Sequence, residues 1–188
     1  MEKINLRQTK LTGIIGSAVS IIGSILASFS MSMGGFDAYT LIILFVVSNI
    51  FTLMAINGVS QKTKMQKIFS SYLMGFILFI VGIILYTISL RGPATSLFGS
   101  VLISIISYAI IVVSAYCTRQ SFDIISVVLN NHYFKTVGML LFVGTISVVF
   151  AAYNFVTLIC AIFELVAFII MPNEFRSGTS AVENIEVP

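Results

Sequence analysis

Glu164 is the residue whose type and position in the sequence most clearly allow chemistry. It is the single charged residue in the apolar segment 136–171. A carboxyl group in hydrocarbon is expected to be protonated, because desolvation penalises its charged form. Ionisable groups at such depth are costly and by default mark a functional site, so Glu164 is our first candidate.

Asn49 is the polar residue that we expect to meet Glu164. Each lies ten residues beyond the outer end of its predicted helix, counted from Tyr39 and from Asn154. At a rise of about 1.5 Å per residue, both lie ~15 Å below one surface, close to mid-membrane. Two interpretations stay open: a proton or cation site, or a protonated acid that hydrogen-bonds a neighbour and helps the helices pack. We favour the second.

Small residues recur along one face of several predicted helices. In lipid, such residues let two helix backbones approach closely, although a stripe of hydroxyl groups can also line a polar pathway. Because no charged residue interrupts the serine stripes, we expect helix packing. The residues assigned to packing are Gly16, Ser20, Ser24 and Ser28 in the first helix, Gly75 and Gly82 in the third, Ser100, Ser104 and Ser107 in the fourth, and Gly138 and Gly144 in the fifth.

Residues suited to catalysis, metals or cofactors do not gather in the sequence. His132 is the single histidine, which excludes bis-histidine haem ligation and a histidine-rich metal site within the chain. Cys117 and Cys160 are predicted at different depths, so we expect no disulfide between them. There is no glycine-rich phosphate-binding motif. We therefore expect a protein that is not an enzyme, with no catalytic residue, metal site or cofactor.

The composition restricts the class of protein more strongly than any motif. Of the 188 residues, 58% are hydrophobic and 9% are charged, against about 25% charged in soluble domains. The mean hydropathy of +1.07 leaves too little polar surface for a water-soluble globule. The net charge of +3 is too small for a nucleic-acid-binding protein. What remains is a polytopic membrane protein.

Apolar segments predict the helices that position these residues. A membrane span needs about 20 apolar residues, and four uncharged segments meet that length. Segment 136–171 is too long for one span, so we divide it into two short helices with a turn near Ala151 and Asn154. The first segment is too long for a signal peptide, whose apolar part runs about 7–15 residues. The sequence predicts an all-α transmembrane helix bundle with six spans, at about 11–33, 39–60, 68–90, 96–116, 136–151 and 154–171.

The connector between the fourth and fifth spans has a helical pattern of its own. Phe122, Ile125 and Val128 recur at helical spacing. A half-apolar helix of this length is typical of one that lies in the membrane interface. We interpret 119–134 as such a helix, with a cytoplasmic extension of the fourth helix as the alternative. Residues 1–172 are then one transmembrane domain, followed by a polar cytoplasmic tail at 173–188.

Basic residues predict the orientation of the spans, because excess Lys and Arg in short loops stays cytoplasmic. Nine of the ten basic residues fall on the side of the N-terminus, the 61–67 loop, the 117–135 connector and the tail. Arg91 falls on the other side, together with Asp37. Most tyrosines lie near predicted helix ends, as expected of rings that prefer a membrane surface. We expect both termini in the cytoplasm and the protein in the plasma membrane.

Four short segments of glycine and apolar residues form a further pattern. They are Leu11–Ser17, Ser121–Ile125, Phe134–Gly138 and Ala167–Pro172. This pattern resembles a domain-of-unknown-function family of small, mostly archaeal, multi-span membrane proteins. The resemblance covers the chain to about residue 172 and implies a multi-span membrane protein with no assigned activity. It carries over no catalytic residue, and Glu164 does not map to its pattern.

Two functions from different classes agree with this sequence. Because the intramembrane polar content is so low, we favour a non-catalytic accessory or scaffold subunit, which packs against other membrane subunits or a second copy of itself. The alternative is a small proton- or ion-coupled transporter or channel that uses Glu164 and Asn49. Both functions place the protein in the lipid bilayer, and neither involves nucleic acid.

Overall fold

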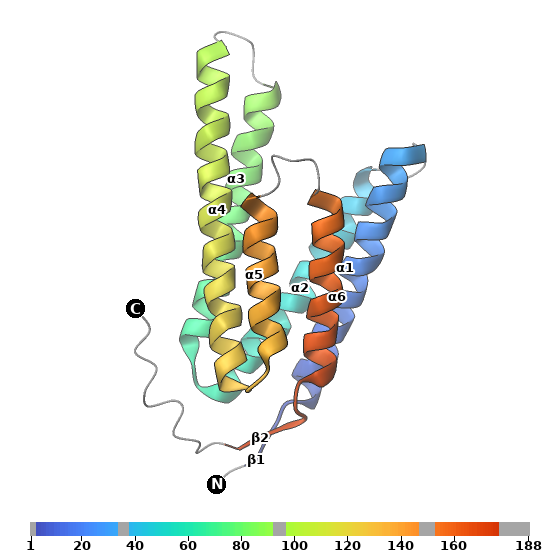
Figure 1. The fold of residues 1–188 in the computed structure, drawn as a ribbon, viewed down its shortest axis with the longest axis vertical. Helices are drawn as coiled ribbons and strands as arrows, with labels where there is room; N and C mark the ends of the chain where they lie inside the picture. Colours follow the sequence, from blue (N-terminus) through green and yellow to red (C-terminus); the bar gives the residue numbers. More distant parts are fainter. Residues whose placement is uncertain (1–2, 34–37, 92–96, 147–152, 177–188) are drawn as a thin grey trace.

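The computed structural model describes residues 3–33, 38–91, 97–146 and 153–176, which form six α-helices and two short β-strands (Figure 1). The predicted all-α helix bundle is confirmed, and the segment 136–171 contains two helices rather than one. The elements in chain order are β1 (Lys3–Asn5), α1 (Arg7–Met33), α2 (Ala38–Thr63), α3 (Gln66–Arg91), α4 (Leu97–Val128), α5 (His132–Ile146), α6 (Tyr153–Ile170) and β2 (Glu174–Arg176).

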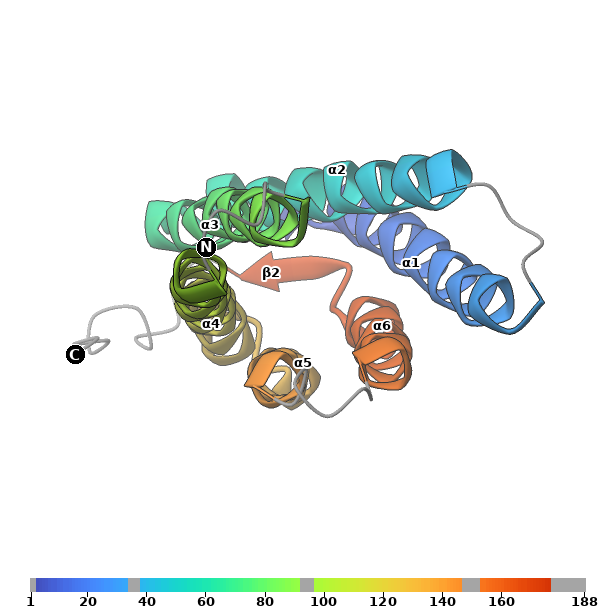
Figure 2. The same ribbon diagram turned by 90° about the horizontal axis from the view of Figure 1, so that it is seen from above.

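The six described helices form a closed ring. Each packs against its neighbours in the sequence, and α1 also packs against α6 (Figure 2). The helices alternate in direction, so the starts of α1, α3 and α5 meet the ends of α2, α4 and α6 at one end of the bundle (Figure 1). We name this the basic end, because it carries Arg7, Lys10, Lys62, Lys64, Lys67, Lys135 and Arg176.

The outward faces of the helices are apolar. Large side chains such as Ile43, Met54 and Ile105 are 61%, 58% and 60% exposed. A continuous surface of this kind aggregates in water, whereas lipid solvates it. Among the described residues, α1 to α4 each contain a segment long and apolar enough to cross a membrane, and α6 contains a shorter apolar one. The chain is therefore a membrane protein, while the six-span arrangement stays a prediction.

The hydrophobic core lies toward the basic end, where four aromatic rings from four helices contact one another in series. Tyr72 of α3, Phe122 of α4, Phe134 of α5 and Phe168 of α6 have successive ring centroids 6.0, 6.1 and 5.2 Å apart. Phe168 also covers Gly13 of α1, where an added Cβ would lie 2.3 Å from the ring. All four rings are at most 8% exposed. We name them the aromatic floor, because they close the ring of helices.

The two strands join the beginning of α1 to the end of α6. They pair antiparallel, and Leu6 N donates a hydrogen bond to the Asn173 carbonyl oxygen at 2.8 Å. Lys10 Nζ donates to the Met171 carbonyl oxygen at 2.9 Å. The sequence analysis does not predict this pairing, since residues from 173 on were expected only to be a polar cytoplasmic tail. These contacts close the ring of helices at the basic end.

Residues 119–128 belong to α4 and not to a separate helix. The helix continues through them because Phe122 and Ile125 are buried in the core, 1% and 0% exposed. It ends just before Asn130, which adopts a positive φ of 49°, a conformation that asparagine tolerates at helix ends. The interfacial-helix interpretation is therefore wrong, and its alternative, an extension of the fourth helix, is correct.

The other predicted helix boundaries agree with the structure to within five residues. The described part of α5 ends at Ile146, so its predicted end at residue 151 lies outside the described residues. Some predicted features lie outside the described residues. They are the loops around Asp37 and Pro93, the turn at Ala151 and the tail beyond Arg176.

Candidate functional site: a cavity inside the helix ring

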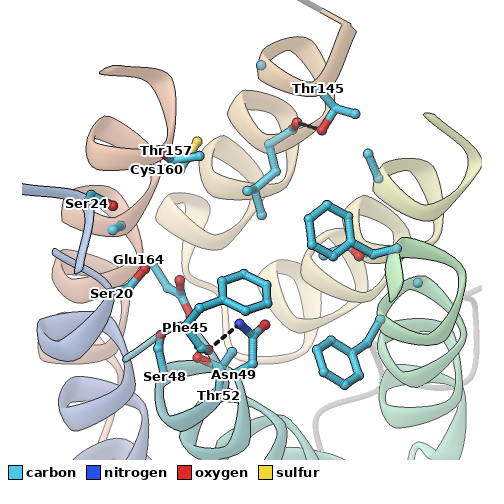
Figure 3. Close-up of a pocket in the computed structure, with 18 of the residues that line it drawn as sticks. Ser20, Ser24, Phe45, Ser48, Asn49, Thr52, Thr145, Thr157, Cys160 and Glu164 are labelled. Atoms are coloured by element: carbon cyan, nitrogen blue, oxygen red, sulfur yellow. Dashed lines mark hydrogen bonds between the residues drawn. The ribbon is translucent and has the colours of Figure 1, made fainter. Parts of the chain in front are cut away.

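A cavity of ≈ 320 Å³ lies inside the ring and is lined by residues from all six described helices (Figure 3). Its volume falls in the range of about 300–1,000 Å³ that is typical of small-molecule sites. Tyr72 and Phe122 line the cavity and also belong to the aromatic floor. Thr145 and Thr157 line it near the ends of α5 and α6 that are remote from the basic end. The cavity thus extends from the floor toward the opposite end of the bundle.

Glu164 projects from α6 into this cavity, toward α2 (Figure 3). Thr52 Oγ1 of α2 donates a hydrogen bond to Glu164 Oε1 at 3.3 Å. The Glu164 side chain is half-buried, and no other hydrogen bond to its carboxyl from the described residues is found. One carboxyl oxygen is held by α2, and the other is left to the cavity.

Asn49 lines the same cavity but does not hydrogen-bond Glu164. Its Nδ2 donates to the carbonyl oxygen of Phe45 in its own helix at 2.8 Å. Thr52, three residues further along α2, occupies the position beside the acid that the sequence assigned to Asn49. The two side chains predicted to share a depth therefore share a cavity, and the direct partner lies one turn deeper.

The small-residue stripe of α1 divides between helix packing and the cavity. Gly16 packs against α2, because an added Cβ there would lie 3.0 Å from Thr52 Oγ1. Ser20 and Ser24 line the cavity, and neither hydroxyl has a hydrogen-bond partner among the described residues. Ser28 is exposed, and its hydroxyl donates to the Ser24 carbonyl oxygen at 2.9 Å.

The stripe of α4 packs against α3 instead. Ser104 Oγ donates to Ser89 Oγ of α3 at 3.0 Å. Ser107 is fully buried beside Gly82, where an added Cβ would lie 3.3 Å from the Ser107 carbonyl oxygen. At Gly75 an added Cβ would lie 2.9 Å from another α4 carbonyl oxygen. The two helices approach backbone to backbone along this line.

Three further residues were assigned to packing. The Ser100 carbonyl oxygen accepts a hydrogen bond from Ser104 Oγ at 2.9 Å within α4. Gly138 of α5 lies against α4, where an added Cβ would be 3.1 Å from Phe122 Cβ. Gly144 is buried and lines the cavity. The small residues thus lie both between helices and around the cavity.

The polar and aromatic residues that line the cavity come mostly from different helices. The side formed by α1, α2 and α6 is the polar wall, with Ser20, Ser24, Asn49, Thr52, Thr157 and Glu164. The side formed by α3 and α4 is the aromatic wall, with Tyr72, Phe76, Phe79 and Phe122. The serine and threonine hydroxyls on that second side, those of Ser114 and Thr118, donate to the Gly75 and Ser114 carbonyl oxygens at 2.8 and 3.1 Å. Their hydrogen bonds are therefore used within the protein.

Sequence reasoning missed Thr52, Thr157 and the aromatic wall. A signal for Thr52 was present, because it lies three residues after Asn49 and therefore on the same helix face. The same spacing relates Phe76 to Phe79 on α3. Without knowledge of which helices are neighbours, such faces cannot be told from the many apolar faces that point to lipid.

Arg119 and Asp123 lie in α4, outside the cavity lining. Arg119 was expected at the start of an interfacial helix. Its guanidinium lies over the Phe142 ring of α5 at 5.5 Å, and its Nε is 3.5 Å from Asp123 Oδ2. Both cysteines are free: Cys160 lines the cavity, and Cys117 does not.

Comparison with known proteins identifies a relative without an established activity. The chain is 24% identical to the uncharacterized protein MJ1644 of Methanocaldococcus jannaschii over 189 residues, which cover 94% of this chain and 99% of the relative. No protein-family model matches the chain, and no solved structure matches it. The relative is archaeal, in agreement with the resemblance noted in the sequence, but membership in that family stays a prediction. The similarity covers most of the chain, and the relative has no described function that could be compared.

Proposed function

We propose that this protein is a carrier, which takes a small solute into the central cavity with Glu164 as the residue that meets it. The observation that supports this is a single cavity lined by all six described helices, with the carboxyl group of Glu164 and the hydroxyls of Ser20 and Ser24 on one wall. An unpaired polar group in hydrocarbon costs several kcal/mol. A bound solute and its water would supply hydrogen-bond partners for the Ser20 and Ser24 hydroxyls and for the carboxyl oxygen of Glu164 that Thr52 does not bind.

The aromatic floor favours a carrier over a channel. Tyr72 and Phe122 of the floor line the cavity, and Phe134 and Phe168 continue the buried core beside them, so in this proposal no polar path continues from the cavity to the basic end. A channel needs such a path, whereas a carrier exposes its site to one side at a time. In this proposal the structure is the state in which the cavity faces away from the basic end.

Charge supports the orientation of the carrier in the membrane. Short segments rich in Lys and Arg are retained in the cytoplasm, so the basic end is assigned to that side and the cavity to the outside of the plasma membrane. In the described residues, Lys62 lies in the last turn of α2, Lys64 in the turn that follows, and Lys67 at the start of α3. Both chain termini are then cytoplasmic.

The arrangement of the small residues supports a carrier more than an accessory subunit. A subunit that binds its partner through small-residue faces needs them on the outside of the bundle. Here Gly75 and Gly82 pack against α4, whereas Ser20 and Ser24 face the cavity. Neither function includes a catalytic step, a metal or a cofactor.

Uptake into proteoliposomes tests the proposal with Glu164→Gln. Glutamine keeps the shape of the side chain and can still accept a hydrogen bond from Thr52, but it cannot carry a charge. We expect the wild-type chain to accumulate at least one radiolabelled solute from a panel of sodium, potassium, methylamine, benzylamine and glycerol. The variant should lose that uptake while its thermal unfolding in detergent is unchanged.

The matched control is Glu174→Gln, which removes an acid on β2, outside the cavity. This variant should transport as the wild type does. The proposal is wrong if no solute of the panel is accumulated, or if Glu164→Gln accumulates it equally well. In either case the accessory-subunit interpretation is preferred, and proteins that co-purify with the native chain in mild detergent become the next measurement.

A further inference from the structure

The cavity lining carries one carboxyl group and no basic side chain among its described residues. Glu164 of α6 is accompanied by two other titratable residues, Tyr72 of α3 and Cys160 of α6. A phenol and a thiol are ordinarily neutral below about pH 8. The described residues of α1, α2, α4 and α5 add no titratable side chain to the lining. A ligand that pairs with the polar wall is therefore a cation or a hydrogen-bond donor, and not an anion.

The opposite wall is suited to an apolar or aromatic group. Phe76 and Phe79 lie three residues apart on one face of α3, and Tyr72 lies one turn before Phe76. The Phe79 ring contacts the Phe45 ring of α2, with centroids 6.0 Å apart, which continues the aromatic surface toward the polar wall. Aromatic faces attract cations as well as other rings, and both attractions are stronger where water is excluded.

An inorganic cation fits this cavity less well than an organic one. Hard metal ions take about six to eight oxygen ligands at close range. On the polar wall, one carboxyl and the Thr52 hydroxyl bound to it are the strongest such ligands. Within the described residues no three His, Cys, Asp or Glu side chains gather to hold a metal ion. A cavity of ≈ 320 Å³ also greatly exceeds the space that a bare ion needs.

We propose that the ligand of this cavity is a small organic ammonium ion with an apolar or aromatic body. Its N–H groups donate to Glu164 and to the hydroxyls of Ser20 and Ser24, while its body packs against Phe76 and Phe79. The polar wall binds the ammonium group and the aromatic wall binds the apolar body. A ligand that has only one of these two groups therefore binds weakly. This inference rests on the proposed function and names its substrate class.

Isothermal titration calorimetry on the purified full chain in detergent tests the proposal with three probes. Benzylamine carries the ammonium group and the ring, methylamine lacks the ring, and benzyl alcohol lacks the charge. We expect benzylamine to bind at least about tenfold more tightly than either of the other two, since it gains both the ionic and the aromatic contacts.

Two variants separate the contributions of the two walls. Glu164→Gln should weaken benzylamine about tenfold or more and leave benzyl alcohol unchanged. Phe79→Leu should weaken benzylamine several-fold and leave methylamine unchanged, because it removes an aromatic face and keeps an apolar one. Phe142→Leu is the matched control, since that ring lies outside the cavity lining and should leave benzylamine binding unchanged. Thermal unfolding of each variant confirms that it is folded.

The outcomes distinguish this inference from the function on which it rests. If methylamine binds as tightly as benzylamine and its binding depends on Glu164, the carrier stands and the inference of an apolar or aromatic body is overturned. If benzylamine binds equally to the wild type and to Glu164→Gln, the inference is overturned as well. If uptake is then also insensitive to Glu164→Gln, the carrier proposal falls with it.

Discussion

The helices α1 and α4 carry similar stripes of small polar residues, but the two stripes have different surroundings. On α4, Ser104 and Ser107 face α3 at close range. On α1, Ser20 and Ser24 face the cavity. The neighbouring helix explains the difference. Helix α3 presents Gly75 and Gly82 to α4, and the two backbones approach closely at both positions. Helix α1 approaches the backbone of α2 this closely at Gly16, which lies before Ser20 and Ser24 in the chain.

Beyond Gly16, α1 and α2 no longer touch backbone to backbone. An added Cβ at Gly23 would lie 3.6 Å from Leu44 Cβ, an ordinary contact, whereas at Gly16 three atoms of α2 would lie within 3.1 Å. A serine stripe therefore packs where its partner presents glycine, and it borders a cavity where its partner does not. The following substitutions test this rule at matched positions on the two stripes.

Leucine should lower the stability of the protein when it replaces a serine of the α4 stripe, but should affect mainly solute uptake when it replaces one of the α1 stripe. Ser107→Leu places a bulky side chain at a fully buried position between α3 and α4, and we expect a loss of about 3 kcal/mol or more in the free energy of unfolding. Ser24→Leu projects into the cavity, so we expect stability within about 0.5 kcal/mol of the wild type and loss of solute uptake. Chemical unfolding in micelles and proteoliposome uptake measure the two effects. Equal destabilisation by both changes would show that the α1 stripe packs too.

Alanine in place of two glycines tests the same difference between the α3–α4 and the α1–α2 contacts. Gly75→Ala forces α3 and α4 apart, because the added Cβ would lie 2.9 Å from a backbone oxygen that cannot turn away. We expect it to lower the free energy of unfolding by about 1–3 kcal/mol. Gly23→Ala meets an ordinary contact and gains helix propensity, so we expect no loss or a gain of up to about 1 kcal/mol. A Gly75→Ala variant as stable as the wild type would contradict the close α3–α4 contact.

Removal of single hydroxyls should give the smallest difference in the free energy of unfolding between the two stripes. Ser104→Ala breaks the hydrogen bond to Ser89 of α3, and such bonds between membrane helices contribute about 0.6 kcal/mol. Ser20→Ala removes a hydroxyl without a partner among the described residues, so stability should not change. A double-mutant cycle of Ser104→Ala with Ser89→Ala measures the pairwise term directly. A coupling energy of zero would mean that this hydrogen bond does not hold the two helices together.

Local patterns account for the parts of the molecule that the sequence predicted. Long apolar segments gave the helices, because each helix in lipid must satisfy its own backbone. Glu164 was found because a charge in an apolar segment is rare. The end of α4 was missed although Asn130 offered a signal, since a pattern of apolar residues at helical spacing runs on into the connector.

Relations between helices account for the parts that the sequence did not predict. Counting from helix ends assumes that all helices begin at one level, and this assumption placed Asn49 beside Glu164. The observed contact with Thr52 indicates that α6 is displaced by about three residues, ~4.5 Å, relative to α2. The two walls of the cavity likewise depend on the order of helices around the ring, which no single segment encodes.

The join between α1 and α6 also sets an order of assembly during synthesis. Lys10 and the Met171 carbonyl group are 161 residues apart, so their contact forms only after almost all of the described chain has left the ribosome. The α3–α4 hairpin is finished long before, because its helices follow one another directly in the chain. Until α6 arrives, the face of α1 around Gly13 lacks the ring of Phe168 and must be shielded by lipid or by the insertion machinery. The cavity that contains Glu164 forms last, and a nascent chain arrested before α6 would hold a folded hairpin but no cavity.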